Sequence, residues 1–466
     1  MQIERNILKL KTRLQTCTQI YFVGIGGIGM SALAKYYLNL GLKVAGYDKT
    51  LSNITKNLKA CGAQITDVDN PNSIPNGYLD LDKTLVVYTP AIPKENTILN
   101  YLQDFGFELY KRADILGEIS KQNFCFAVAG THGKTTTSTM LGHILTDNGI
   151  DATAFLGGIS ENYHTNLIQG KAKVCVIEAD EFDRSFLKLE PNLACITATD
   201  ADHLDIYKNK EAFEASFDAF ANKTSDQIFV KKGLPIKGLT FAVDEAADYS
   251  ASNLRFENGL FLFDVKTPNE HLNNIVLGLP GAHNVSNALA ALAMANYYGV
   301  SLSNIAKSLK TFKGINRRFT YKINTENMVL VDDYAHHPTE INAIYNALRK
   351  RYPNKEILAV FQPHLFSRTR DFADNFASSL AQFDQLLLLD IYPARELPIA
   401  GITSAWLLDK IKATNPGNAQ NYRLISKAKI TTSIEQSKAQ VVLFIGAGDI
   451  GVLVDRVVAS LIKSIK

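Results

Sequence analysis

The sequence predicts an α/β protein of about three domains whose sheets are mostly parallel. Three observations lead to this prediction. The chain has 466 residues, and domains commonly hold ~150 residues each. Short apolar runs alternate with longer helical stretches, as in βα units. Glycine-rich or acidic turns directly follow several of these runs, where open parallel sheets bind their ligands.

Composition and charge favour a cytoplasmic protein without a nucleic-acid partner. Lysines and arginines nearly balance the acids, for a net charge of +3, so no basic stripe for a nucleic-acid partner is expected. The amino-terminal residues contain no apolar core typical of a signal peptide. Since no apolar run approaches the ~20 residues that span a bilayer, no membrane insertion is expected. The five cysteines form no C-x-x-C pair, which fits core thiols in a reducing compartment.

Residues 1–111 are expected to form the first domain, followed by a linker over 112–122. The apolar runs of this domain are separated by helical stretches, so we interpret them as strands of a parallel sheet. The predicted strands are Gln19–Val23, Leu42–Tyr47, Leu85–Tyr88 and Phe107–Tyr110.

The second domain is expected over residues 123–314. Phenylalanines recur at helical spacing in 211–221, and Val285–Tyr298 is an alanine-rich helix. Residues 228–278 look like short antiparallel strands with polar turns, which predicts a small antiparallel sheet beside a mostly parallel one. The buried parallel strands are predicted at Phe124–Ala129, Val174–Ile177 and Leu193–Thr197.

Residues 315–466 form the third predicted domain, again with a doubly wound α/β pattern. The glycine-rich stretch Gly446–Gly451 follows its last strand, and we interpret it as a strand-to-helix turn without a ligand. The predicted strands are Met328–Val331, Glu356–Phe361, Gln385–Leu389, Tyr422–Ile425 and Gln440–Ile445.

A G-x-G-x-x-G motif lies directly after the first strand and opens a helix. Glycines there allow a tight turn and let a diphosphate approach the helix N-terminus, where unpaired N–H groups attract anions. Asp48 closes the next strand, a usual place for a ribose contact. The pattern alone leaves open which nucleotide binds, and a turn without a ligand is the alternative. The candidate residues are Gly24, Gly26, Gly27, Ile28, Gly29 and Asp48.

A second glycine motif, at 130–136, is more specific. Gly-Lys-Thr at a strand-to-helix turn is typical of phosphate binding, with Lys134 on the β- and γ-phosphates and the Thr135 hydroxyl on Mg²⁺. Val128 stands where the general P-loop pattern has its first glycine, so the loop is a G-x-x-G-K-T variant. Its members are Gly130, Thr131, His132, Gly133, Lys134, Thr135 and Thr136.

Acidic side chains follow two further strands of this domain. Glu178-Ala179-Asp180-Glu181 comes after one strand, and Asp200-Ala201-Asp202-His203 comes after the other. Acids at the ends of adjacent parallel strands face one crevice. Because crowded carboxylates repel each other, a cation such as Mg²⁺ is expected among them. The alternative is that some of these acids only cap helices.

Polar residues also follow two strands of the third domain, over 332–338 and 362–370. Their histidines and arginines suit recognition of carboxylates and phosphates. Two further polar stretches, 281–284 and 314–319, lie between the second and third domains and read as a hinge that carries an arginine.

Taken in order, these motifs resemble those of the Mur ligases. The matching stretches are GIGGIGM, GTHGKTTT, EADEFD, DADHLD, PGAHNVSNALAA, GINRRF, VDDYAHHPTE, FQPHLFSRTRDF and GAGDIG. They span nearly the whole chain, and GIGGIGM is most similar to the alanine-adding branch. The resemblance implies a Rossmann-like domain for a UDP-sugar, a central P-loop ATPase domain and a Rossmann-like domain for the amino acid.

The resemblance further implies a bacterial ligase of peptidoglycan synthesis that uses ATP with Mg²⁺, UDP-N-acetylmuramate and L-alanine, as a monomer or homodimer. It assigns catalytic roles to Lys134, His132, Glu178 and His203, and the metal to Thr135, Glu178 and His203. For ATP it adds Asn284, Arg318 and Asp333 to the phosphate loop, and for the muramoyl and amino-acid end it implies His337, His364 and Arg368.

Two positions depart from the family pattern. Ala198 lies where relatives often have asparagine, and Leu365 lies where some alanine-adding ligases carry arginine. These differences concern metal and substrate contacts. The sequence contains no evident counterpart of the carbamylated lysine of later ligases in the pathway, which the alanine-adding branch also lacks.

Other functions leave motifs unexplained. A NAD-dependent dehydrogenase would use the first glycine motif but not the second. A P-loop ATPase without ligase activity would leave the first and third domains without a role, and a non-catalytic nucleotide-binding scaffold would not need the lysine and acids. Within the family, the nearest alternative is the recycling ligase that joins a peptide to UDP-N-acetylmuramate.

Overall fold

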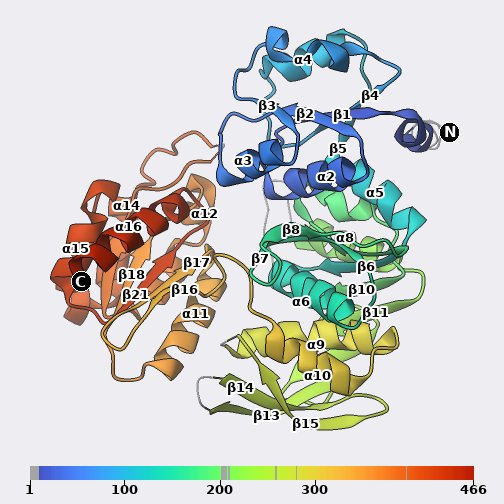
Figure 1. Cartoon of the computed structure of the whole chain (residues 1–466). Coiled ribbons are helices and arrows are strands. Elements are labelled where there is room, and N and C mark those ends of the chain that lie inside the picture. Colours follow the sequence, from blue (N-terminus) through green and yellow to red (C-terminus); the bar gives the residue numbers. More distant parts are fainter. Residues whose placement is uncertain are drawn as a thin grey trace. The chain divides into compact units, whose positions relative to one another are not determined.

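The computed structural model describes residues 10–200, 207, 210–257, 260–279, 281–394 and 396–465 (Figure 1). The chain divides into two compact units. The first comprises Met1–Arg255, Leu262–Gly278 and Asn284–Lys313, and the second comprises Phe256–Phe261, Leu279–His283 and Gly314–Lys466. The described residues contain three sheets: one lies in the first unit, one is formed mainly by the first unit, and one lies in the second. No helix among them is long and apolar enough to cross a bilayer.

The first sheet is parallel, with strand order β3-β2-β1-β4-β5. Successive residues of its strand β1 pack on opposite faces of the sheet. Ile20 and Phe22 join one apolar cluster, and Tyr21 and Val23 join another. The strands are β1 (Gln19–Val23), β2 (Lys43–Tyr47), β3 (Gln64–Thr66), β4 (Thr84–Tyr88) and β5 (Leu109–Lys111). The helices are α2 (Ile28–Asn39), α3 (Asn53–Ala60), α4 (Thr97–Asp104) and α5 (Arg112–Gln122), so the stretch expected to be a linker is helical.

The second sheet has ten strands in the order β15-β14-β13-β12-β11-β10-β6-β9-β7-β8. The strands are β6 (Phe124–Ala129), β7 (Thr153–Ser160), β8 (Thr165–Ile168), β9 (Val174–Glu178), β10 (Leu193–Ile196), β11 (Gln227–Lys231), β12 (Leu239–Val243), β13 (Tyr249–Glu257), β14 (Leu260–Lys266) and β15 (His271–Leu277). The helices are α6 (Lys134–Asp147), α8 (Lys210–Ala221), α9 (Ala282–Tyr297) and α10 (Leu302–Thr311), with a short 3-10 segment η3 (Phe182–Lys188).

The prediction of mostly parallel sheets with added antiparallel strands is confirmed, since β6 pairs in parallel with β9 and β10, whereas β7 and β8 pair antiparallel. The expectation that residues 228–278 are antiparallel is wrong for their first part. There, β11 pairs in parallel with β12, and β12 with β13, within the large sheet. Side chains alternate identically in both orientations, so a sequence pattern does not give strand direction.

The third sheet, in the second unit, has the order β16-β17-β21-β18-β19-β20. It is parallel except for the edge strand β16, which pairs antiparallel with β17 and was not predicted. The strands are β16 (Thr320–Asn324), β17 (Val329–Asp333), β18 (Ile357–Phe361), β19 (Gln385–Leu388), β20 (Tyr422–Leu424) and β21 (Val441–Ile445). The helices are α11 (Pro338–Arg351), α12 (Phe366–Asp371), α13 (Ala373–Leu380), α14 (Ser404–Thr414), α15 (Ile430–Ser437) and α16 (Ile450–Ile465).

The central strands of the third sheet are apolar at every position because helices cover both faces. All five residues of β18 are buried. Ile357, Ala359 and Phe361 belong to one cluster, and Leu358 and Val360 belong to the cluster on the other face. This double burial explains why β18 and β21 read as uninterrupted apolar runs in the sequence.

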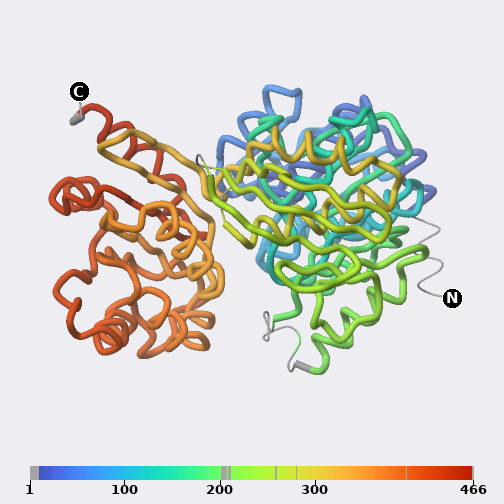
Figure 2. Tube along the Cα trace, turned by 90° about the horizontal axis from the view of Figure 1, so that it is seen from below, coloured from blue at the N-terminus to red at the C-terminus, as the bar shows by residue number. Residues whose placement is uncertain are grey.

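Within the first unit, helix α2 of the first sheet packs against β7 and β8 of the second, and these elements lie side by side in Figure 1; Figure 2 shows the same fold from below. The rings of Tyr36 and Phe155 lie 5.3 Å apart. The buried Asn166 on β8 donates to the carbonyl of Ile28 and, at 2.8 Å, to the hydroxyl of Ser31. The helix that opens at the first glycine motif is therefore held by the second sheet.

Candidate active site

The phosphate loop lies between β6 and α6, as the sequence predicts. Gly130 and Gly133 have φ angles of 130° and 84°, in a region that side-chain-bearing residues rarely adopt. Gly133 is the N-cap of α6, and no side chain caps it. The N-cap residue therefore supplies no acceptor to the N–H groups of the first helical turn, which suits binding of an anion.

Lys134 begins α6 and is buried beside the acidic motif. Its Nζ donates to the carbonyl oxygen of Gly130 at 2.6 Å and to the Glu181 carboxylate at 2.7 and 2.8 Å. Burial by itself would lower the pKa of Lys134, but the carboxylates of Glu181, Asp180 and Glu178 outweigh it and raise that pKa. Lys134 therefore stays charged in the folded protein.

Thr135 and Glu178 form the second contact between the loop and the acids. The Thr135 hydroxyl donates to Oε1 of Glu178 at 3.0 Å. Gly157 on β7 lies against the same carboxylate, so a Cβ at that position would come within 2.6 Å of the Glu178 Cδ. Gly157 thus leaves the space that the Glu178 side chain occupies.

The donors at this point fit Mg²⁺. Magnesium prefers hard oxygen ligands and keeps several waters or phosphate oxygens, so one or two protein oxygens suffice. Thr135 and Glu178 supply a hydroxyl and a carboxylate beside the phosphate loop. Among the described residues, no group of three histidine, cysteine or acidic side chains could hold a metal ion by itself. His203, the third expected ligand, lies outside the described residues.

His132 lies in the middle of the loop. Its Nε2 is 3.6 Å from Oδ2 of Asp200, which follows β10. The Thr197 hydroxyl donates to the carbonyl of Ala129 at 3.1 Å and also to that of His132. The end of β10 therefore holds the loop in place from the side opposite Glu178.

Helix α9 brings two asparagines to this loop. Asn284, a predicted ATP contact, is buried, and its Oδ1 accepts from Asn287 at 3.4 Å. Asn287 lies so close to Gly133 that a Cβ there would collide with its Oδ1. Asn287 was not predicted, although it falls in the quoted stretch PGAHNVSNALAA, one helical turn after Asn284.

In the first sheet, the glycine motif has the predicted position after β1. Gly24 has a φ of 87°, and Gly27 is the N-cap of α2. Asp48 supports the motif, since Oδ2 accepts from the N–H of Gly26 at 2.7 Å and Oδ1 from Thr50 at 3.0 Å. Asp48 therefore shapes the loop as well as lying where a ribose contact is expected.

The predicted residues of the third sheet gather after β17 and β18. Arg368 Nη1 lies 3.3 Å from Nδ1 of His364, whose ring stacks on Tyr392. His337 is the N-cap of α11, and its ring meets that of Phe372 edge to face. His337 also lines a cavity of about 240 Å³ between α11 and α13.

Asp333 and Arg318 are close in this unit. Asp333 accepts from the N–H of Phe319 at 2.6 Å and from that of Ala335 at 2.7 Å. Burial is the main influence on its carboxyl and raises the pKa to about 6. Burial likewise lowers the pKa of the neighbouring His336 to about 4. Arg318 stacks over Tyr334.

The side chain of Arg317 packs against the stretch Gly446–Gly451. Arg317 donates to the carbonyl of Gly446 at 2.6 Å, and a Cβ at Gly451 would collide with its guanidinium. This arrangement fits the interpretation of the stretch as a strand-to-helix turn without a ligand.

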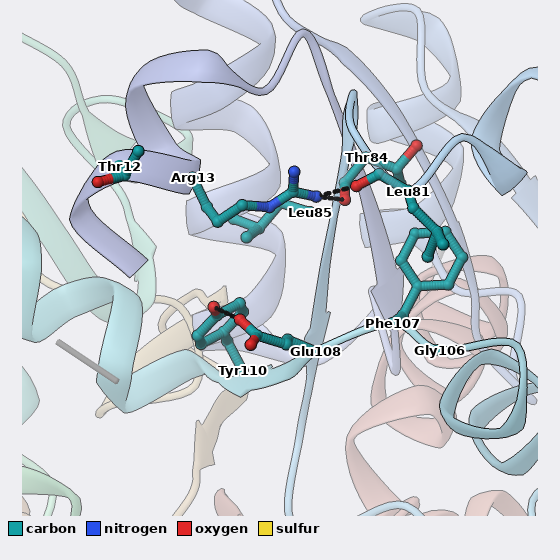
Figure 3. Close-up of a pocket in the computed structure, with 9 residues that line it drawn as sticks. All are labelled: Thr12, Arg13, Leu81, Thr84, Leu85, Gly106, Phe107, Glu108 and Tyr110. Atoms are coloured by element: carbon teal, nitrogen blue, oxygen red, sulfur yellow. Dashed lines mark hydrogen bonds between the residues drawn. The ribbon is translucent and has the colours of Figure 1, made fainter. Parts of the chain in front are cut away.

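A cavity of about 480 Å³ lies at the other end of the first sheet, near the amino ends of β4 and β5 (Figure 3). Arg13 crosses it to the carbonyl oxygens of Leu81, Asp82 and Thr84, and Tyr110 donates to Glu108 at 2.6 Å. None of the predicted site residues lines it.

The fold, the phosphate loop with its acidic side chains, and the residues that follow β17 and β18 define a Mur ligase, and the chain belongs to that family. Residues 19–124 match the profile of the Mur ligase family catalytic domain, 128–295 the Mur ligase middle domain, and 317–448 the Mur ligase glutamate ligase domain. Among its relatives, the UDP-N-acetylmuramate–L-alanine ligase of Flavobacterium psychrophilum is 54% identical over 93% of this chain and 96% of its own.

Solved structures agree with this relationship. The UDP-N-acetylmuramate-alanine ligase of Thermotoga maritima matches with a TM-score of 0.83 and 28% identity, over 96% of this chain and 99% of its own. A murein peptide ligase from Psychrobacter arcticus matches with a TM-score of 0.70 at 24% identity, over 95% and 98% of the two chains, a likeness in fold.

Proposed function

We propose that this protein joins L-alanine to UDP-N-acetylmuramate with ATP, through an acyl phosphate, in peptidoglycan precursor synthesis. The observation that carries the proposal is the contact of Thr135 with Glu178 beside Lys134, at the turn between β6 and α6. The UDP-N-acetylmuramate–L-alanine ligases that are 53–54% identical to the chain support the choice of substrates.

A carboxylate has a poor leaving group, so it must be activated by phosphorylation before an amine can displace it. The lactyl carboxylate attacks the γ-phosphorus of ATP, and ADP leaves. The alanine amine then attacks the acyl carbon, loses a proton and expels phosphate. Positioning and charge neutralisation account for most of the catalysis of phosphoryl transfer. Lys134 neutralises charge on the phosphates, and the N–H groups of the loop hold them.

Within this proposal, Thr135 and Glu178 would hold Mg²⁺, together with His203. The ion would supply charge neutralisation on the phosphate oxygens. His132, at the centre of the loop, is assigned to the reacting phosphoryl group. Asn284, Arg318 and Asp333 are kept as ATP contacts, and His337, His364 and Arg368 as contacts of the muramoyl and amino-acid end.

We propose the domain limits 1–111, 123–314 and 315–466, with 112–122 as the helical link between the first two. The proposed partners are small molecules, with no nucleic acid, and the chain acts as a monomer or homodimer. The Gly24–Gly29 motif and Asp48 receive the UDP-sugar.

Phosphate release with purified protein tests the function. We expect release only when ATP, Mg²⁺, UDP-N-acetylmuramate and L-alanine are all present. Greater release with a peptide than with L-alanine would instead indicate the recycling ligase. Hydrolysis of ATP at the same rate without either substrate would indicate a P-loop ATPase that is not a ligase. Glycine and L-serine belong in the same assay, because one methyl group is worth only ~1–3 kcal/mol in a pocket.

A further inference from the structure

Arg112, the first residue of α5, lies between the first glycine motif and the acidic motif. A Cβ at Gly29 would be 2.8 Å from the Arg112 Cζ and would collide with Nη1, so the guanidinium lies against the first turn of α2. On its other side, Nη2 lies 3.4 Å from Oδ2 of Asp180, two residues after Glu178. One cation therefore touches both predicted binding regions of the first unit.

The contact with Asp180 is weak compared with those around it. The adjacent Lys111 pairs with Asp183 at 2.5 Å, and Lys188 pairs with Asp114 at 3.0 Å, so the β5–α5 junction is already fastened to the segment after the acidic motif. Asp180 also accepts from the N–H of Phe182 at 3.1 Å. Contacts other than the Arg112–Asp180 pair therefore also hold this segment.

The Arg112 guanidinium is suited to bind an anionic group other than the Asp180 carboxylate. About a quarter of the Arg112 side chain is exposed (26%). Arginine offers a planar fork of donors that can grip a carboxylate or phosphate with two hydrogen bonds. Its ion pair with Asp180 uses a single long contact through Nη2. Gly29 leaves room for the guanidinium, and any side chain there would displace it.

We infer that Arg112 binds an anionic group of the UDP-sugar as that substrate extends from the Gly24–Gly29 motif toward Lys134 and Glu178. This inference rests on the proposed function. The group is either the diphosphate or the lactyl carboxylate, and both have the same chemistry toward a guanidinium. In binding it, Arg112 exchanges Asp180 for the substrate.

Calorimetric titration of the full chain tests the inference, with UDP-N-acetylmuramate, UDP and ATP as probes. We expect Arg112→Gln to raise the Kd of UDP-N-acetylmuramate at least tenfold and to leave that of ATP within twofold. A similar loss for UDP would identify the diphosphate as the group bound. A loss confined to UDP-N-acetylmuramate would identify the carboxylate.

Two controls separate binding from support of the fold. Lys111→Gln removes the neighbouring cation and should leave the Kd of UDP-N-acetylmuramate within twofold. Asp180→Asn releases Arg112 from its protein partner and should leave substrate binding equal or tighter. If Asp180→Asn weakens binding as much as Arg112→Gln does, the ion pair is structural and the inference is wrong.

UDP-N-acetylmuramate binding by Arg112→Gln and by the wild type also tests the inference. Binding of UDP-N-acetylmuramate by Arg112→Gln within twofold of the wild type would overturn the inference while leaving the proposed function intact. Absence of UDP-N-acetylmuramate binding by the wild type would overturn the proposed function, and this inference with it. If Arg112→Gln does not fold, Arg112→Lys keeps the charge without the fork, and a Kd at least threefold higher is expected.

Discussion

Lys134 and Glu181 form a buried ion pair in which the lysine Nζ lies 2.8 and 2.7 Å from the two carboxylate oxygens. Only 14% and 2% of the two side chains are exposed. The hydroxyl of Tyr207 donates to the backbone carbonyl of Glu181, which fixes the acid further. The lysine expected to contact phosphates is thus held by a protein carboxylate, and phosphates must compete for it.

Lys134→Ala should abolish ligation while leaving UDP-sugar binding nearly intact. The lysine belongs to the phosphate loop after β6, whereas the predicted UDP-sugar loop follows β1 in another sheet. Phosphate release and calorimetric titration with UDP-N-acetylmuramate would measure the two effects. Loss of both together would show that the division of the two sites is wrong.

Removal of only one member of this ion pair should also destabilise the protein. Lys134→Met leaves Glu181 buried without its cation, and breaking a buried pair in this way costs about 3–5 kcal/mol. The double variant Lys134→Met/Glu181→Gln should recover most of that loss. Urea unfolding of both variants provides the comparison, and equal stabilities would mean that Glu181 carries no charge in the folded Lys134→Met variant.

Gly157→Ala should impair catalysis by moving Glu178. The new methyl group would lie within 2.6 Å of the Glu178 Cδ, so the carboxylate must leave its present position, in which it contacts Thr135. We expect a rate at least tenfold lower and a higher Mg²⁺ concentration for half-maximal activity. Gly77→Ala is the matched control, because a Cβ at Gly77 meets nothing within 4 Å. An unchanged Mg²⁺ requirement in Gly157→Ala would argue against Glu178 as a ligand.

Asp333 and His336 should give the second unit opposite responses to acid. The folded pKa of Asp333, about 6, exceeds its ordinary 3.8. The folded protein therefore binds this proton more readily than the unfolded chain, and the acid's contribution to stability grows as pH falls from 6 to 4. His336, with a folded pKa of about 4 against 6.5, is protonated more readily when unfolded, so stability is lost over the same range.

Two variants separate these responses in urea unfolding between pH 4 and 7. His336→Gln should lose less stability on acidification than the wild type, and Asp333→Asn should lose more. Each difference should be about 3 kcal/mol or less, because a shift of one pKa unit corresponds to 1.36 kcal/mol. Parallel pH profiles for all three proteins would contradict both assignments.

Local features of the sequence predicted most of the central strands and the loops that follow them. β1 and β6 have the predicted limits, and β9, β17 and β21 differ from them by one or two residues, since apolar runs bounded by glycine or acids mark buried parallel strands. The Gly-Lys-Thr loop was found because the phosphate chemistry requires adjacent residues. The parallel direction of β11 and β12 and the edge strand β16 were missed, because pairing partners are distant in sequence.

The sequence by itself determined the fold class, the family motifs and the identity of the side chains at the strand ends. Only the tertiary structure decided what those side chains touch: Lys134 on Glu181, Gly157 behind Glu178, Asn287 beside Gly133, and Arg112 between two motifs. The physical reason is that a local pattern sets backbone conformation over a few residues, whereas these contacts join strands and helices that meet only when the sheets pack.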